Sequence, residues 1–336
     1  MEKLIDSYNR QIIYFRISLT DRCNFRCIYC STSEKNFYFI PHQEILRYEE
    51  IAEIARVAGD LGMTKIRLTG GEPLVRKGIV DLIKQLSRIR TLEDISMTTN
   101  GYFLADLATS LKNAGLKRVN ISLDSLQREK FKQITGFDGL EKALRSIDTA
   151  LKIGLTPVKI NVVLLKGINE NEIEDFIQLT FDKPVYVRFI ELMPTNRQLT
   201  KVNMKHYVSA QTILEKMKIK FSDLKPSLNE EACGPAVYYQ LPGAKGTIGF
   251  ITAISQHFCA RCNRIRLTAE GKLRPCLYSS KEINLKGRLR SLPLENRNLR
   301  RKIIQESLEE AIRIKPFRHH IRDNHISEFN MSEIGG

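Results

Sequence analysis

The sequence predicts an α/β protein: an incomplete (β/α)6 TIM-like barrel followed by a smaller α+β C-terminal domain. Three observations predict this fold class. Over the first two hundred of the 336 residues, apolar strand-like runs alternate with amphipathic helical runs. Glycines stand where helices would end, at Gly62, Gly115 and Gly154. Polar side chains also recur on one face of successive strands, which indicates a cavity within the sheet.

The βα units can be assigned one by one from the local pattern. Strands are expected over Ile12–Leu19, Lys65–Thr69, Asp94–Thr98, Arg118–Leu123, Val158–Leu165 and Val185–Glu191. Helices are expected over Glu49–Leu61, Gly78–Ile89, Leu104–Ala114, Gly139–Ile153 and Glu170–Thr180. The first helix repeats apolar residues every three or four positions: Ile51, Ile54, Ala55, Ala58 and Leu61. This alternation favours a parallel sheet with right-handed crossovers.

Six such units fit either an open doubly wound sheet or an incomplete barrel, and the strand faces favour the barrel. One parity of the strands is polar: Arg16 and Ser18, Arg67 and Thr69, Asn120 and Ser122, Lys159 and Asn161, and Arg188. Because burial of an unpaired charge is costly, cations on an inward face indicate a wet cavity that admits a sizeable anion. The alternative is that some of these side chains lie at edges or pair with acids.

The pattern changes after Pro194, so we expect the barrel within residues 1–200 and the C-terminal domain within residues 201–336. Thr195–Asn203 is typical of a linker. The C-terminal elements expected are helices over Tyr207–Lys218 and Leu299–Ile314 and strands over Val237–Gln240, Thr247–Ile254 and Asn263–Leu267. The segment Ala269–Lys272 is typical of a hairpin turn.

Composition narrows the function classes. The chain is 42% hydrophobic and 27% charged, which argues against wholesale disorder. It contains no apolar run near the roughly 18 residues that span a bilayer. Its first ten residues are too polar for a secretory signal. We therefore expect a cytoplasmic protein that does not associate with a membrane. The net charge of +15 favours an anionic partner such as nucleic acid, a membrane surface or a phosphorylated small molecule.

The chain has seven cysteines: Cys23, Cys27, Cys30, Cys233, Cys259, Cys262 and Cys276. An odd number of thiols in a reducing compartment makes a disulfide framework improbable, and clustered thiols there more often hold metal. The spacing Cys23-x3-Cys27-x2-Cys30 follows the first strand, where a barrel has its active site. Three thiolates can hold three irons of a [4Fe–4S] cluster and leave the fourth iron open for catalysis. Zinc is the alternative, although only the distant His42 offers a fourth ligand.

A second triplet, Cys259-x2-Cys262-x13-Cys276, again supplies three thiols, in the C-terminal part of the chain. By itself it also fits zinc with His257 as a ligand. Basic residues are interleaved with it and suit an anion bound near the metal: Arg261, Arg264, Arg266, Lys272 and Arg274. We assign no role to Cys233.

The first cysteine motif resembles the radical S-adenosylmethionine (SAM) superfamily. Within that superfamily, six segments in order resemble the GTP 3′,8-cyclase family of molybdenum cofactor biosynthesis: Thr20–Cys27, Thr69–Pro73, Thr98–Gly101, Asn120–Asp124, Phe189–Pro194 and Phe258–Thr268. The resemblance covers nearly the whole chain. The second triplet distinguishes this family from most of its relatives.

The resemblance implies two [4Fe–4S] clusters and SAM as cofactors. The first triplet would hold the cluster that binds SAM, and Tyr29, Gly71, Ser122 and Met193 would line the SAM site. A glycine pair at this place lets the backbone approach the amino acid part of SAM closely. Reduction of the cluster would split SAM into methionine and a 5′-deoxyadenosyl radical, which would take the hydrogen from C3′ of GTP.

The resemblance also implies GTP as the substrate, held across one cationic cavity that both triplets face. The C3′ radical would attack C8 of guanine, and the second cluster would bind the base. The residues implied in GTP binding are Arg16, Arg67, Thr98, Lys159, Arg264, Ile265 and Arg266. The C-terminal Gly335 and Gly336 would reach into the active site. Ser31-Thr32 departs from the Met-Pro that the family commonly has there, which puts the shape of the SAM loop in doubt.

Partners follow from the same resemblance. We expect a reductant such as flavodoxin or ferredoxin, cyclic pyranopterin monophosphate synthase as the next enzyme, no nucleic acid, and a monomer or homodimer. Two alternatives stay open. The chain could be a radical SAM enzyme that acts on RNA or a peptide, although Arg261–Lys302 offers one aromatic residue, Tyr278, for base stacking. It could also be a zinc-stabilised nucleic-acid-binding module without catalysis.

Overall fold

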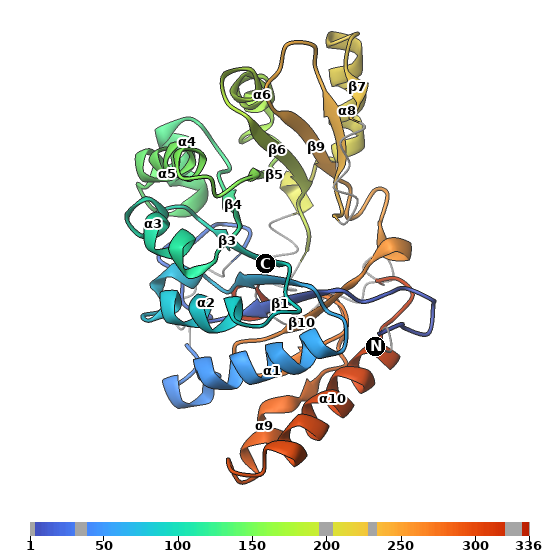
Figure 1. Cartoon of the computed structure of the whole chain (residues 1–336). Helices are drawn as coiled ribbons and strands as arrows, with labels where there is room; N and C mark the ends of the chain where they lie inside the picture. Colours follow the sequence, from blue (N-terminus) through green and yellow to red (C-terminus); the bar gives the residue numbers. More distant parts are fainter. Residues whose placement is uncertain (1–3, 31–38, 195–203, 228–233, 320–330, 336) are drawn as a thin grey trace.

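A computed structural model describes residues 4–30, 39–194, 204–227, 234–319 and 331–335. Within these residues, twelve strands form one mixed sheet in the order β12-β11-β10-β1-β2-β3-β4-β5-β6-β9-β8-β7. Figure 1 shows the sheet curving around the centre of the molecule, with helices along its outer side. This is the partial barrel that the sequence predicts.

The middle of the sheet consists of six parallel strands in chain order. They are β1 (Tyr14–Ser18), β2 (Lys65–Thr69), β3 (Asp94–Thr99), β4 (Arg118–Ser122), β5 (Val158–Leu164) and β6 (Val185–Glu191). The bounds of β2 and β6 are those predicted, and the other four agree within two residues at either end.

Helices connect these strands. They are α1 (Tyr48–Asp60), α2 (Ile79–Ser87), α3 (Leu104–Ala114), α4 (Arg128–Thr135), α5 (Leu140–Lys152) and α6 (Ile173–Asp182). Short 3₁₀ turns precede or follow several of them: η1 (His42–Glu44), η2 (Pro73–Val75) and η3 (Glu170–Glu172). The local pattern did not predict α4, because half of this short helix is charged and only Phe131 and Ile134 are buried apolar residues.

The C-terminal segment adds strands to both edges of the same sheet. They are β7 (Lys225–Pro226), β8 (Val237–Gln240), β9 (Thr247–Ile251), β10 (Arg264–Leu267), β11 (Lys272–Arg274) and β12 (Ile283–Asn284). β10 pairs in parallel with β1, and β9 pairs in parallel with β6. These pairings satisfy backbone groups that an open six-stranded sheet would leave exposed at its edges. The C-terminal strands therefore extend the first sheet, and a domain boundary at residue 200 stays a prediction.

The remaining described helical elements are η4 (Met204–His206), α8 (Ala210–Lys220), η5 (Cys259–Arg261), α9 (Leu285–Arg290), α10 (Arg297–Arg313) and α11 (Met331–Ile334). Ion pairs join α10 to α1. Arg300 contacts Glu53 at 2.5 Å, and Arg301 contacts Asp60 at 2.6 Å. None of the helices in the described ranges combines the length and the apolar character needed to cross a bilayer.

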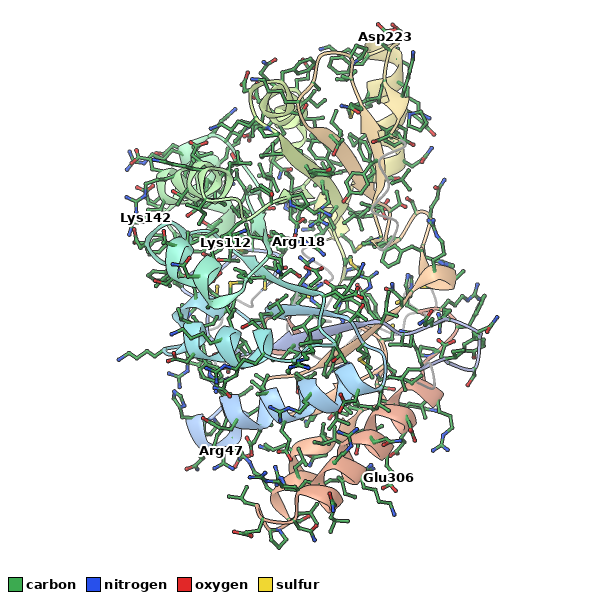
Figure 2. The ribbon with its side chains drawn as sticks, viewed as in Figure 1. Arg47, Lys112, Arg118, Lys142, Asp223 and Glu306 are labelled. Atoms are coloured by element: carbon green, nitrogen blue, oxygen red, sulfur yellow. The ribbon has the colours of Figure 1, made fainter. Side chains whose placement is uncertain are left out.

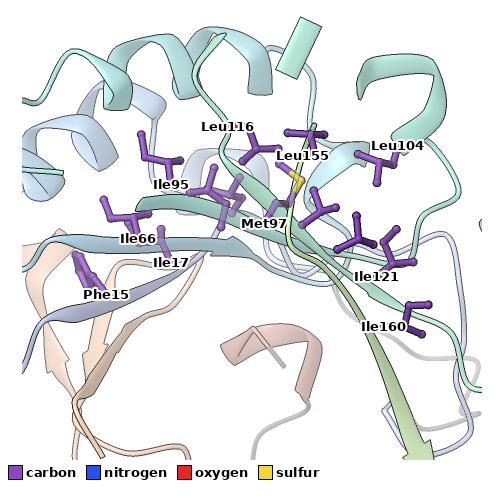
Figure 3. Close-up of a cluster of buried hydrophobic side chains, with 14 of the residues drawn as sticks. Phe15, Ile17, Ile66, Ile95, Met97, Leu104, Leu116, Ile121, Leu155 and Ile160 are labelled. Atoms are coloured by element: carbon purple, nitrogen blue, oxygen red, sulfur yellow. The ribbon is translucent and has the colours of Figure 1, made fainter. Parts of the chain in front are cut away.

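The apolar parity of the barrel strands packs against the helices and forms the core. Figure 3 shows part of this core, including Phe15, Ile17, Ile66, Ile95, Met97, Leu104, Leu116, Ile121, Leu155 and Ile160. All of these side chains are buried. Because side chains alternate across a strand, burial of this parity turns the polar parity toward the concave side of the sheet.

Candidate active site

A cavity of about 840 Å³ lies on the concave side of the sheet. Both cysteine triplets line it: Cys23, Cys27 and Cys30 from the first, and Cys259, Cys262 and Cys276 from the second. None of these six described cysteines is part of a disulfide. The fold therefore brings two triplets that lie far apart in the sequence to one space.

The first triplet lies in the loop after β1, at the carboxyl end of the parallel strands. The backbone amide of Phe25 donates to Cys23 Sγ at 3.4 Å, and the side-chain amide of Asn100 donates to the same sulfur at 3.9 Å. The amide of Cys30 donates to the carbonyl oxygen of Cys27 at 2.9 Å, which turns the loop back on itself.

The thiolate forms of Cys23 and Cys27 are unfavourable without a metal. Burial and the nearby Glu72 carboxylate raise the pKa of Cys23 to about 11. Burial and Asp124 raise the pKa of Cys27 well above its ordinary value. A positive centre such as iron would reverse this preference, since metal binding requires and stabilises the thiolate.

Glu72 organises the strand ends beside the first triplet. Its carboxylate accepts hydrogen bonds from the Asn100 amide at 2.7 Å, from Thr99 Oγ1 at 2.8 Å and from the Leu74 amide at 3.0 Å. Burial nevertheless raises its pKa to about 7. These contacts tie the loops after β2 and β3 together.

Gly70 and Gly71 meet the loop of the first triplet. A Cβ atom on Gly70, whose φ is +153°, would lie 2.5 Å from the carbonyl oxygen of Thr20, and one on Gly71 would collide with the carbonyl oxygen of Arg22. The Gly71 amide donates to the Thr20 carbonyl oxygen at 2.7 Å. The glycines thus let two backbone segments touch, a reason that differs from the close approach of SAM expected from the sequence.

The second triplet has cationic surroundings. Cys259 begins η5, and Cys276 follows β11. Burial alone would raise the pKa of Cys262, but Arg264 and Lys315 outweigh burial and lower it to about 6. Cys262 therefore differs from Cys23 and Cys27, whereas burial and the neighbouring thiols raise the pKa of Cys259 in the same triplet.

Each triplet suits an iron–sulfur cube, because such a cube spreads its thiolates over separate irons. Among the described residues, no three His, Cys, Asp or Glu side chains are close enough to share one metal ion. Each triplet supplies three thiols for a cube whose fourth iron stays open.

The polar strand parity lines the space between the triplets. Register pairs place Arg16 beside Arg67 and Arg266 on neighbouring strands. Further cavity-lining residues on this face are Thr98, Asn120, Ser122, Lys159, Asn161, Arg188 and Arg264. Ile265 is buried in the hydrophobic core, so its predicted GTP contact stays a prediction.

Crowding of these cations has an electrostatic cost. Burial and Arg266 lower the pKa of Arg16 well below its ordinary value. Burial and Arg264 lower the pKa of Arg266 to about 10. Burial alone would raise the pKa of Tyr14, but nearby arginines lower it, and Arg67 donates a hydrogen bond to its hydroxyl. Such a site gains stability when an anion binds.

Some of the charges in the cavity are already paired. Arg118 Nε donates to Asp94 Oδ1 at 3.1 Å, and both residues line the cavity. Figure 2 places Arg118 near the middle of the molecule, with Asp223 and Glu306 at opposite ends.

The four residues implied in SAM binding also line this cavity: Tyr29, Gly71, Ser122 and Met193. The Tyr29 hydroxyl donates to Asp124 at 2.5 Å, and Asp124 accepts the Val163 amide at 2.8 Å. Burial raises the pKa of Asp124 to about 6.

The end of the chain reaches the same strands. The carbonyl oxygen of Gly335 accepts a hydrogen bond from Arg266 at 2.7 Å. Gly335 has a φ of +73°, and a Cβ atom there would lie 2.5 Å from Thr69 Cγ2. Gly336, Cys233 and Ser31-Thr32 lie outside the described residues.

Comparison with known proteins identifies the family. The Radical SAM superfamily model matches residues 17–180, and the Molybdenum Cofactor Synthesis C model matches residues 185–321. A GTP 3′,8-cyclase of Desulforamulus reducens is 49% identical over 99% of this chain and 100% of its own length. The chain belongs to the GTP 3′,8-cyclase family. A second member, from Petrotoga mobilis, is 47% identical over 99% of this chain and 100% of its own length.

Solved structures agree with this family fold. Streptococcus suis SuiB bound to precursor peptide SuiA aligns with a TM-score of 0.57 and 15% identity, over 94% of this chain and 68% of SuiB. SuiB alone aligns with a TM-score of 0.58 and 13% identity, over 90% of this chain and 69% of that one. At this identity the likeness concerns the fold only.

Sequence reasoning missed several residues of this family member's cavity. Tyr14, Tyr238, Tyr278 and Lys315 line it as well. Lys159 lies 5.4 Å from the ring centre of Tyr186 and 5.9 Å from that of Tyr238. Tyr14 shares the parity of Arg16, which could have identified it. Lys315 carries no such local signal, because it follows a helix far from the barrel strands in the sequence.

Proposed function

We propose that the chain cyclises GTP to (8S)-3′,8-cyclo-7,8-dihydroguanosine 5′-triphosphate, the first step of molybdenum cofactor biosynthesis. The observation that supports this most is that two cysteine triplets line one cavity whose remaining wall is rich in cations. The match to GTP 3′,8-cyclases over the full chain supports the same reaction.

Cys23, Cys27 and Cys30 would hold the first [4Fe–4S] cluster, and Cys259, Cys262 and Cys276 the second. Tyr29, Gly71, Ser122 and Met193 would surround SAM at the first cluster. When bound and reduced, this cluster and SAM supply the radical chemistry that removes the C3′ hydrogen of GTP. The hydrogen bonds of Glu72 and Asn100 hold the loop of the first triplet in place.

Arg16, Arg67, Lys159, Arg264 and Arg266 would bind the triphosphate. Arg266 is buried beside the half-buried Arg16, and burial together with neighbouring arginines lowers the pKa of both, a cost that a bound polyanion would relieve. Charge-assisted hydrogen bonds from guanidinium groups suit phosphate oxygens. Thr98 accepts a hydrogen bond from Arg67 at 3.5 Å and thereby helps to orient that guanidinium group.

The strand ends and the C-terminal segment would exclude water from the reacting centre. Gly335 closes against Thr69 and is held by Arg266, one of the proposed triphosphate ligands. Substrate binding and the position of the chain end are thus coupled through one guanidinium group.

The remaining partners are part of the same proposal. A flavodoxin or ferredoxin would supply electrons, and cyclic pyranopterin monophosphate synthase would take the product. The net charge of +15 supports docking of an acidic electron carrier. The chain would work in the cytoplasm as a monomer or homodimer, with the SAM chemistry in residues 1–200 and the base-binding cluster in residues 201–336.

Anaerobic reconstitution tests this proposal. The full chain should take up about eight irons and eight sulfides, as two cubes require. With GTP, SAM and dithionite it should release the cyclised nucleotide, 5′-deoxyadenosine and methionine. With ATP in place of GTP, no cyclised nucleotide should form. A colourless, zinc-loaded chain, or an iron-loaded one that leaves GTP unchanged, would contradict the proposal.

A further inference from the structure

Lys315 is a buried cation that the proposed function does not use. It follows α10 and is 3% exposed. Its ammonium group donates to Cys262 Sγ at 3.5 Å and to the carbonyl oxygens of Arg264 at 2.8 Å and Pro275 at 2.7 Å. Because a lysine ammonium has three donors, all three have a partner. The side chain therefore links the sulfur of one cysteine to the residue that precedes Cys276.

Arg10 holds the segment after this lysine from the other side. The Arg10 guanidinium donates to the carbonyl oxygens of Cys259 at 2.7 Å, Pro316 at 2.7 Å and Phe317 at 2.9 Å. Its charge is balanced by a buried aspartate four residues earlier. Figure 1 shows the N-terminal segment beside the end of α10, in agreement with these contacts. Lys315 therefore contacts Cys262 and the residue before Cys276, and Arg10 contacts Cys259.

The two cations contact different atoms of the triplet. Lys315 donates a hydrogen bond to a cysteine sulfur, whereas Arg10 donates to the main-chain carbonyl oxygen of Cys259. At the first triplet, by contrast, Cys23 accepts hydrogen bonds from the neutral amide groups of Phe25 and Asn100. Hydrogen bonds to cluster sulfurs and nearby charge are among the factors that set the reduction potential of an iron–sulfur cluster.

We infer that Lys315 is a positioning residue that preorganises the second cysteine triplet and raises the reduction potential of the cluster bound there. Positive charge next to a thiolate ligand favours the reduced, more negative state of a cluster. Arg10 preorganises the same triplet through the main chain alone. The inference rests on the proposed second [4Fe–4S] cluster.

The test uses the full chain in a Cys27→Ser background, which removes the first cluster so that spectra report the second alone. Lys315→Met, Lys315→Arg and Arg10→Gln are each reconstituted anaerobically. Lys302→Met is the matched control, because it removes an exposed cation from α10. Iron and sulfide are counted, and the midpoint potential is measured by electron paramagnetic resonance during titration with dithionite.

Lys315→Met should lower the midpoint potential, Lys315→Arg should restore most of it, and Lys302→Met should match the parent. Arg10→Gln should lose iron to a chelator faster than the parent, with the potential of the retained cluster unchanged. If Lys315→Met takes up no iron while Lys315→Arg does, preorganisation by a cation is supported. The inference is overturned if Lys315→Met keeps both the parent potential and the parent iron content.

Two further results distinguish this inference from the proposed function. Loss of folding in both Lys315→Met and Lys315→Arg, seen by circular dichroism of the apo chain, would mark a general structural residue and overturn the inference. A parent chain that binds no iron through Cys259, Cys262 and Cys276 would instead contradict the proposed function, and the inference with it.

Discussion

Glu50 offers a quantitative test of how the C-terminal helices are fastened to the barrel. Its carboxylate is 3% exposed and accepts hydrogen bonds from Arg290 Nε at 2.8 Å, Arg290 Nη2 at 2.9 Å and the Arg47 amide at 2.7 Å. Burial alone would raise its pKa, but these bonds outweigh burial and lower the pKa from 4.5 to about 2. A carboxylate with a lowered folded-state pKa stabilises the fold above its unfolded pKa and loses that effect as pH falls toward the folded value.

The magnitude follows from the size of this pKa change. The lowering of the Glu50 pKa from 4.5 to about 2 corresponds to about 3.4 kcal/mol as an upper bound. Solvent screening around the Arg290 side chain, which is 31% exposed, reduces this value to about 2 kcal/mol. We therefore predict that Glu50→Gln lowers the free energy of unfolding of the apo chain by about 2 kcal/mol near pH 7. The difference should shrink to roughly two fifths of that near pH 3.

Urea unfolding followed by circular dichroism measures this difference at each pH. Glu306→Gln is the matched control, because Glu306 forms an exposed pair with Lys302 and should change stability by less than about 0.5 kcal/mol. A Glu50→Gln chain as stable as the parent near pH 7, or a stability difference that does not depend on pH, would show that this carboxylate does not stabilise the fold.

Three further predictions concern the cavity. Gly335→Ala should reduce turnover at least about tenfold while leaving SAM affinity unchanged, because a Cβ atom would meet Thr69 and a positive φ disfavours alanine; wild-type turnover in steady-state assays would argue against the role of the tail. Lys159→Met should weaken GTP binding about tenfold, measured by calorimetry, as expected for loss of a charged contact of about 1.4 kcal/mol. The exposed control Lys152→Met should bind GTP like the parent chain. If Lys159→Met also binds GTP like the parent, Lys159 does not contact the nucleotide. Gly71→Ala should lower iron uptake by the first triplet alone, because its Cβ atom would collide with the Arg22 backbone, and full iron content would contradict that packing.

Local pattern predicted most of the barrel, because its elements depend on short-range features. β2, β6 and α3 have the predicted bounds, since each repeats apolar residues at regular spacing between clear turn residues. The polar parity also predicted the cavity, as Arg16, Arg67 and Lys159 line it. Alternation along a strand is a local property, and it fixes which side chains share a face.

Pairings between distant segments could not be predicted in this way. No local feature of β10 indicates that it lies beside β1, or that β9 lies beside β6. The same limit hid Lys315, whose contact with Cys262 spans 53 residues of sequence. The spacing of the six cysteines predicted two three-thiol clusters, but only the resemblance connected these clusters with SAM and with the predicted GTP contacts.

The two cysteine triplets face one cavity, and we propose that they perform separate tasks there. Parallel assays on Cys27→Ser and Cys276→Ser test it most directly, with 5′-deoxyadenosine release and formation of the cyclised nucleotide measured in the same anaerobic reaction. Cys27→Ser should lose both products. Cys276→Ser should still cleave SAM but form no cyclised nucleotide. Formation of that nucleotide by Cys276→Ser at the parent rate would contradict the claim.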